Sequence, residues 1–125
     1  MKIIVTTLAT LFLGTAAVYA AEPAKVTTID GVKVYTDTND MTLYTFDKDT
    51  TGKSSCDGDC ALKWPPFKAE EGAAAEGDWT IVERTDGTMM WAYDGKPLYT
   101  YEGDKTAGEA TGDGMDGVWH LAKAD

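Results

Sequence analysis

The sequence predicts a mostly β domain in which two related units, each based on β-hairpins, pack with pseudo-two-fold symmetry. A long stretch from Leu43 to Trp64 returns 55 residues later, from Leu98 to Trp119, with six identities and two conservative exchanges. A repeat at a fixed offset indicates a duplicated structural unit. The sequence around both copies is rich in β-branched and aromatic residues and is broken by Asp-Gly pairs, a pattern typical of hairpins.

The first twenty residues have the features of a secretory signal peptide. Lys2 supplies one positive charge, an uncharged and largely apolar run covers residues 3–18, and Val18-Tyr19-Ala20 offers small residues where a signal peptidase reads them. An uncleaved membrane anchor is the alternative, since the run approaches the length that spans a bilayer. Its threonines and alanines make it weakly hydrophobic. We therefore expect cleavage after Ala20 and no stable membrane insertion of the mature protein.

Residues 21–125 suffice for a single all-β domain made of two repeats, at about 26–69 and 79–125, joined by an acidic Ala/Gly linker at 70–78. Loss of Lys2 with the leader takes the formal net charge from −10 to −11. Such an excess of acidic groups repels nucleic acid and makes small cations or basic surfaces more plausible partners. The simpler interpretation, which we favour, is a solvated acidic face without a specific ligand.

The order of the elements follows from local patterns in the first repeat. The alternation from Val26 to Tyr35 predicts a half-buried strand, and residues 31–46 predict a hairpin that turns at 37–40. A short helical turn is expected at 61–64, directly after Cys60. Pro65 and Pro66 should end it, because proline lacks the backbone N–H that a helix requires.

The second repeat begins with an expected buried strand at 79–82. Asp94-Gly95 predicts a tight hairpin turn, because both residues accept positive φ, and Pro97 suits a strand start or an edge. A long irregular loop should follow Asp104, and a short strand at 118–121 should close the domain.

Aromatic residues and aspartates recur at equivalent places in the two copies. They are Tyr44, Phe46, Asp49 and Trp64 in the first repeat, and Tyr99, Tyr101, Asp104 and Trp119 in the second. Each aspartate falls where a strand should end, so its carboxylate can accept backbone N–H groups of the loop that follows. We favour this structural role over a ligand-binding role for the motif.

Cys56 and Cys60 are the only cysteines, and an exported chain meets an oxidising compartment, so we expect a disulfide. Closing so short a loop should contribute only about 2 kcal/mol. A redox protein that uses this pair is a weaker alternative, since thioredoxin-type sites use a C-x-x-C spacing.

Metal binding is a further alternative, with copper and calcium close to each other. Met89, Met90, Met115 and His120 are ligand types that suit copper in an exported protein. Residues 47–52 copy the first half of an EF-hand loop, but Gly58 stands where calcium requires a bidentate Glu. Asp104, Asp113 and Asp116 could supply oxygen ligands. Methionines in strands are more often packing residues, and we commit to no metal and no cofactor.

Classical catalytic patterns are missing from the sequence. It has one histidine, no glycine-rich phosphate loop, no H-E-x-x-H and no C-x-x-C-H. We therefore expect a protein that is not an enzyme.

The motif copies resemble an exported-repeat family, many of whose members are predicted lipoproteins, known for a Y-x-[FWY]-x-x-D pattern. Residues 44–49 and 99–104 match this pattern, and the run from Cys56 through Gly58, Cys60 and Trp64 to Pro66 is similar to that family's first repeat. The resemblance implies export and a duplicated fold, and it supplies no catalytic residues. No cysteine follows the leader, so this member should be free in the periplasm rather than tethered by lipid.

Together these observations predict a periplasmic or secreted, non-enzymatic protein that binds an unknown small ligand or associates with an envelope component. Metal binding and thiol redox chemistry remain the alternatives.

Overall fold

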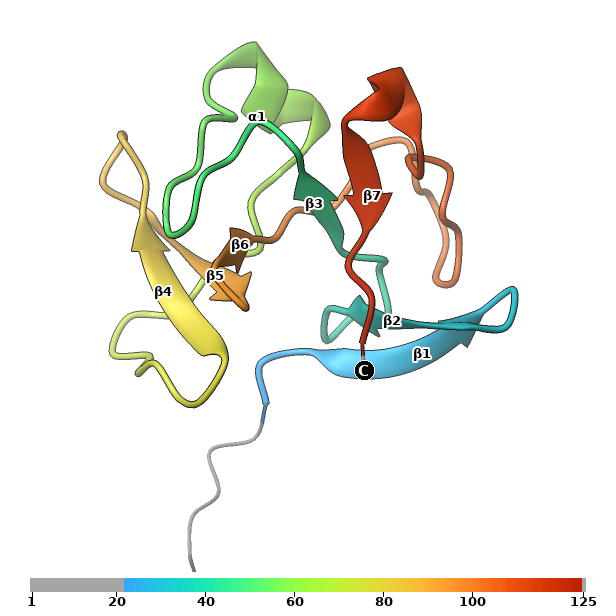
Figure 1. Cartoon of the computed structure of the whole chain (residues 1–125), viewed down its shortest axis with the longest axis horizontal. Helices are drawn as coiled ribbons and strands as arrows, with labels where there is room; N and C mark the ends of the chain where they lie inside the picture. The colour runs from blue at the N-terminus through green and yellow to red at the C-terminus, as the bar shows by residue number, and fades with distance from the viewer. Residues whose placement is uncertain (1–21, 125) are drawn as a thin grey trace, which may run out of the picture.

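A computed structural model describes residues 22–124 of the chain; the predicted signal peptide and its cleavage site lie outside the described residues. The elements, in chain order, are β1 (Lys25–Ile29), β2 (Val32–Thr36), β3 (Tyr44–Phe46), α1 (Asp59–Lys63), β4 (Trp79–Glu83), β5 (Met89–Tyr93), β6 (Lys96–Pro97), the 3₁₀ turn η1 (Met115–Gly117) and β7 (Trp119–Leu121). Figure 1 shows α1 and the turn before β7 at one end of the molecule and the β1–β2 hairpin at the other.

The predicted fold class is confirmed: strands dominate, both repeats carry antiparallel sheets, and the α-helix among the described residues is one short turn. β1 pairs with β2, β3 with β7, and β4 with β5, which also pairs with β6. Among the described helices, none is long and apolar enough to cross a membrane.

The two repeats meet back to back at their equivalent tyrosines. The Tyr44 N–H donates to the Tyr99 carbonyl oxygen at 2.7 Å, and the Tyr99 N–H donates to the Tyr44 carbonyl oxygen at 3.0 Å. A pair of reciprocal bonds between equivalent residues is what a two-fold axis through this point requires. Tyr44 and Tyr99 are both completely buried.

The last segment of each repeat pairs with the sheet of the other repeat. The Tyr35 N–H on β2 donates to the Ala122 carbonyl oxygen at 2.8 Å, and at the equivalent place the Trp91 N–H on β5 donates to the Phe67 carbonyl oxygen, also at 2.8 Å. Residues 65–69 of the first repeat therefore extend the sheet of the second, and residues 119–124 extend the sheet of the first. Neither repeat has a complete sheet alone.

The predicted strand from Val26 to Tyr35 is wrong, because the chain turns back in its middle. Asp30 and Gly31 have φ values of 49° and 81°, and Ile29 pairs with Val32 across them. This is the two-residue hairpin that favours Asp-Gly, and the polar/apolar alternation on both sides of it hid the break.

The predicted hairpin over residues 31–46 is right in its turn and wrong in its extent. Thr36 pairs with Thr42, and the Leu43 N–H donates to the Tyr35 carbonyl oxygen at 3.0 Å. Beyond Leu43 the chain leaves β2, and β3 pairs with β7 from the other repeat. β2 keeps β1 as its partner strand, whereas β3 finds its partner strand, β7, in the other repeat.

The remaining local predictions agree with the structure. Asp94 and Gly95 have φ values of 52° and 78° and connect β5 to β6, where Tyr93 pairs with Lys96. The helical turn begins at Asp59, slightly earlier than expected. The final strand occupies Trp119–Leu121.

Two buried clusters form the core. One lies around the axis and contains Tyr44, Cys56, Trp64, Val82, Met90, Ala92, Tyr99 and Trp119. The other lies between the β2 and β4–β5 sheets and contains Ala24, Tyr35, Leu43, Trp79, Leu98 and Ala122, with Phe67, Trp91, Tyr93 and Ala124 packed against it.

Candidate ligand-binding cleft

The tyrosine and the aspartate that recur in both repeats are joined across the axis rather than within one copy. The Tyr44 hydroxyl donates to Asp104 Oδ2 at 2.6 Å, and the Tyr99 hydroxyl donates to Asp49 Oδ2 at 2.6 Å. Each aspartate therefore accepts a hydrogen bond from the tyrosine of the other repeat.

The second carboxylate oxygen of each aspartate holds the loop that follows it. Asp49 Oδ1 accepts the backbone N–H of Ser55 at 2.7 Å, and Asp104 Oδ1 accepts that of Thr111 at 2.9 Å. The hydroxyls of Ser55 and Thr111 donate to the same oxygens. A short carboxylate that accepts a loop N–H and a hydroxyl fixes the loop's path.

Burial and a carboxylate neighbour keep both phenols protonated. Loss of hydration, followed by the hydrogen bond to Asp104, raises the pKa of Tyr44 well above its ordinary value. Loss of hydration and the bond to Asp49 raise the pKa of Tyr99 in the same way. Both effects oppose a phenolate, so both hydroxyls remain donors at neutral pH.

The other aromatic residues of the motif form one stack through the axis. Trp64 and Trp119 lie face to face with ring centroids 3.7 Å apart. Phe46 stacks on Trp119 at 4.2 Å, and Tyr101 stacks on Trp64 at 4.3 Å. The motif's second aromatic residue thus covers the tryptophan of the opposite repeat, and these rings pack against one another.

The predicted disulfide is present and joins Cys56, in the loop before α1, to Cys60 in α1. Arg84 fastens this loop to the second repeat: its Nη2 donates to the Cys56 carbonyl oxygen at 2.7 Å, and its Nη1 donates to Ser54 Oγ at 2.9 Å. Sequence reasoning missed this residue, which is 5% exposed. The available signal was that it is the chain's only arginine.

The candidate metal ligands have other environments in the structure. Met90 is completely buried in the axial cluster, whereas Met89, next to it on β5, is 40% exposed. Met115 is exposed as well, and His120 Nε2 lies 2.7 Å from Asp47 Oδ2 in a solvent-exposed pair. Within residues 22–124, no group of three or more His, Cys, Asp or Glu side chains is placed to hold a metal ion.

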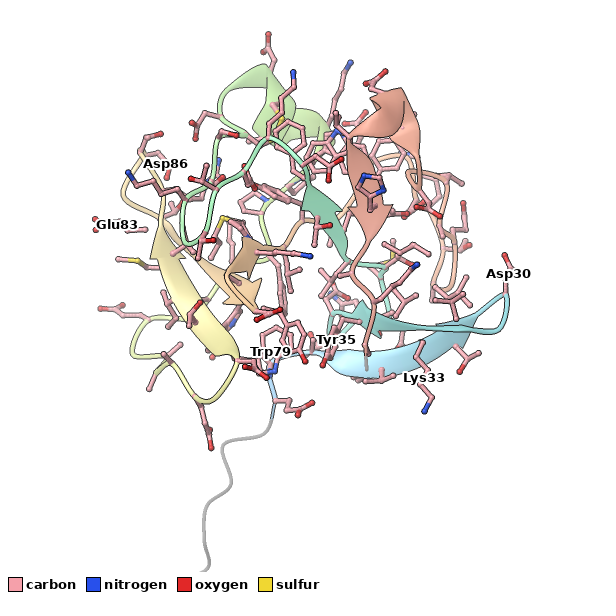
Figure 2. All side chains as sticks on the ribbon, in the orientation of Figure 1. Asp30, Lys33, Tyr35, Trp79, Glu83 and Asp86 are labelled. Carbon is pink, nitrogen blue, oxygen red and sulfur yellow. A yellow bond between two sulfur atoms is a disulfide. The ribbon has the colours of Figure 1, made fainter. Side chains whose placement is uncertain are left out.

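A cleft of about 670 Å³ opens at the edge of the second core cluster, where the two repeats meet. Four aromatic residues form its wall: Tyr35, Trp79, Trp91 and Tyr93. Figure 2 shows Tyr35 and Trp79 close together between β4 and the β1–β2 hairpin, and Glu83 at the far end of β4.

The aromatic wall is held by ring contacts and by strand pairing. Trp79 lies edge-on to Tyr35 with ring centroids 5.1 Å apart, and 4.9 Å from the ring of Tyr93. Trp79 pairs with Tyr93 in the β4–β5 ladder, two residues from the pair formed by Ile81 and Trp91. Tyr35 and Trp79 are buried, while Trp91 and Tyr93 are partly exposed.

The segment before β4 also lines the cleft, through Ala73, Ala74 and residues 76–78. Glu76 and Trp79 pair with each other and hold this segment in a tight turn. The Glu76 N–H donates to the Trp79 carbonyl oxygen at 2.9 Å, and the Trp79 N–H donates to the Glu76 carbonyl oxygen at 3.0 Å. Gly77 between them has a φ of 58°. The Asp94 N–H donates to the Asp78 carbonyl oxygen at 2.9 Å, which anchors the segment to the β5–β6 turn.

The rim of the cleft is acidic. Glu22, Glu76 and Asp78 line it and are exposed, and none of the three forms an ion pair with another described residue. No lysine or arginine contributes to the lining.

Sequence reasoning did not identify this cleft, because its walls come from four separated parts of the chain. One signal was available in the repeat itself. In the two hairpin ladders the pair Ile81–Trp91 is equivalent to Val26–Tyr35. Trp79 and Tyr93 of the second repeat therefore correspond to Ala24 and Asp37 of the first, so the second copy carries two additional large rings. A difference between copies of a duplicated unit is where a property specific to one copy should be sought.

Comparison with known proteins gives one match. A sequence model for a family described as a secreted repeat of unknown function matches residues 25–68 and residues 80–123. No curated protein and no solved structure matches the chain.

Proposed function

Since the chain belongs to this family of secreted repeats of unknown function, we propose that it is a non-enzymatic periplasmic binding protein that takes a small ligand into the aromatic cleft. An envelope component that presents a small group of the same kind is an equivalent partner. The cleft, and not the repeated Tyr/Asp motif, is the binding element in this proposal.

The observation that carries the proposal is the aromatic cleft itself. Pockets of about 300–1,000 Å³, lined mainly by apolar and aromatic side chains with a few polar groups, are typical of small-molecule sites. The cleft has a volume of about 670 Å³ and this type of lining. The first repeat folds with Ala24 and Asp37 where the second has Trp79 and Tyr93, so the duplicated fold alone does not demand these rings.

Rigid support favours binding at this site. Trp79 is on β4, Trp91 and Tyr93 are on β5, and both strands belong to one antiparallel ladder. Wall residues fixed before a ligand arrives lose little conformational entropy on binding, which improves affinity.

The engagement of the chain's reactive groups supports a non-enzymatic role. His120 is paired with Asp47, Arg84 is used to hold the loop at Cys56, and Cys56 is bonded to Cys60. None of them lines the cleft. The cleft offers aromatic faces and carboxylates, which suit recognition.

The proposal can be tested by nuclear magnetic resonance on protein carrying isotope-labelled tryptophan. Trp79 and Trp91 line the cleft, while Trp64 and Trp119 stack at the axis and serve as an internal reference. We expect at least one class in a panel of amines, carboxylic acids, sugars, short peptides and amphiphiles to shift the indole signals of the first pair saturably. The second pair should stay in place.

A matched pair of variants controls this experiment. Trp91→Leu removes part of the wall and should abolish the response, whereas Leu62→Ala removes a side chain that is 70% exposed on α1 and should leave it intact. The proposal is wrong if no class shifts the cleft signals, or if all four tryptophans respond alike. Chemical conversion of a bound compound, detected by mass spectrometry, would overturn the non-enzymatic part.

A further inference from the structure

We infer that the ligand of the cleft is an organic cation with an apolar body, such as a quaternary ammonium or a protonated amine. This inference rests on the proposed function, since it assigns a ligand class to the same site. Two features carry it together: the aromatic wall and the unpaired carboxylates at the rim.

The aromatic wall suits a positively charged group. The face of an indole or phenol ring has negative electrostatic potential, and a cation within about 6 Å of the ring centroid is attracted to it. The ring centroid of Trp79 lies 4.9 Å from that of Tyr93 and 6.3 Å from that of Trp91, and its ring is edge-on to the ring of Trp91. Rings that meet at steep angles form the corner of a cage rather than a flat stacking platform.

The rim suits the same charge. Glu22, Glu76 and Asp78 form no ion pair with a described basic residue, so their negative charges are available to attract a cation at the cleft. A net charge of −10 for the whole chain adds attraction at longer range and speeds the association of cations. An anionic ligand would meet repulsion from all three carboxylates.

The size and the chemistry of the cleft exclude a bare metal ion as the preferred occupant. A volume of about 670 Å³ is far larger than an ion needs, and within the described residues no group of three His, Cys, Asp or Glu side chains is placed to hold a metal ion. Hard cations require several oxygen ligands at short distance, whereas organic cations bind through ring faces and apolar contact.

The charge requirement can be isolated with two probes of one shape. Choline and its uncharged tert-butyl analogue differ only in carbon replacing the quaternary nitrogen. In calorimetric titrations of the purified protein, we expect choline to bind about five- to thirtyfold more tightly than the analogue. Salt should weaken only choline binding, because only that probe is attracted by the carboxylates.

Variants then separate the contribution of the rim carboxylates from that of the aromatic rings. Glu76→Gln and Asp78→Asn should each weaken choline binding severalfold and leave the analogue unaffected. Glu83→Gln, which removes the same charge from the far end of β4, should change neither (Figure 2). Tyr93→Leu keeps an apolar wall without a π face, so it should lower the affinity for choline more than that for the analogue.

The outcomes separate this inference from the proposed function. Equal affinity for the two probes, or selective binding of a neutral sugar in the cleft, would overturn the cation assignment while the cleft stayed a binding site. Absence of choline binding in protein whose cleft tryptophans respond to another compound would do the same. If no compound of any class reaches the cleft, both proposals fall.

Discussion

Removal of the Tyr44 hydroxyl should destabilise the protein more than removal of any other single oxygen atom in the motif. In Tyr44→Phe, the bond of 2.6 Å to Asp104 Oδ2 is lost, and the carboxylate of Asp104, which is 5% exposed, keeps only its partners at Thr111. Loss of a buried hydrogen bond to a charged group costs about 1.5–3 kcal/mol. The ring itself stays, so no cavity term adds to this figure.

The equivalent change in the second copy, Tyr99→Phe, should cost less. Asp49 is only partly buried, so water can replace the lost donor in Tyr99→Phe. We expect about 1 kcal/mol for that variant. Tyr101→Phe is the matched control, because its ring is stacked on Trp64 and its hydroxyl has no hydrogen bond to another described residue.

Urea unfolding followed by circular dichroism measures all three variants on one scale. The midpoint should fall in the order Tyr101→Phe, Tyr99→Phe, Tyr44→Phe, with an unchanged slope, since the surface exposed on unfolding is the same. A Tyr44→Phe protein as stable as the Tyr101→Phe control would refute the reasoning. The cross-axis bond would then contribute nothing net, and the motif would need another explanation.

Three further outcomes are expected. Stability should fall as pH rises above about 10, because Tyr44 and Tyr99 have raised folded-state pKa values and the unfolded state releases these protons first. The urea midpoint should therefore decline between about pH 8 and about pH 11, and a constant midpoint would contradict this. Arg84→Met should lower the free energy of unfolding, measured with urea, by about 2–4 kcal/mol, because the Cys56 carbonyl and its neighbours lose a buried donor. A decrease below about 0.5 kcal/mol would count against this role of Arg84. Residues 22–69 expressed alone should show no cooperative unfolding transition in circular dichroism, since Ala122 and its neighbours are absent; a folded half would disprove the exchange of segments.

Local patterns in the sequence predicted the strands, the Asp94-Gly95 turn and the duplication, because each depends on residues close together in the chain. The same kind of evidence failed at Asp30-Gly31. There the alternation of apolar residues continued across a tight turn, and the strand periodicity masked a turn signal as strong as the one at Asp94-Gly95. A period of two is preserved when a two-residue loop separates two strands, so periodicity alone does not locate the break.

The partners of the motif could not be read from the sequence for a different reason. Asp49 was expected to hold its own loop, and it does accept the Ser55 N–H, but its bond to Tyr99 depends on how the repeats face each other. The exchange of terminal segments likewise joins residues that are far apart in the chain, such as Tyr35 and Ala122. Contacts of this kind follow from the packing of whole units, which no local window contains.

The duplication also explains why the candidate cleft lies where it does. Residues near the axis, such as Tyr44 and Tyr99, must satisfy each other, so a change in one copy is opposed by its equivalent in the other. Positions away from the axis have no such constraint, and there Trp79 and Tyr93 stand against Ala24 and Asp37. A duplicated fold is therefore stabilised by the positions at which its copies agree. A site for one ligand can arise where the copies differ, and in this molecule that place is the aromatic cleft with its acidic rim.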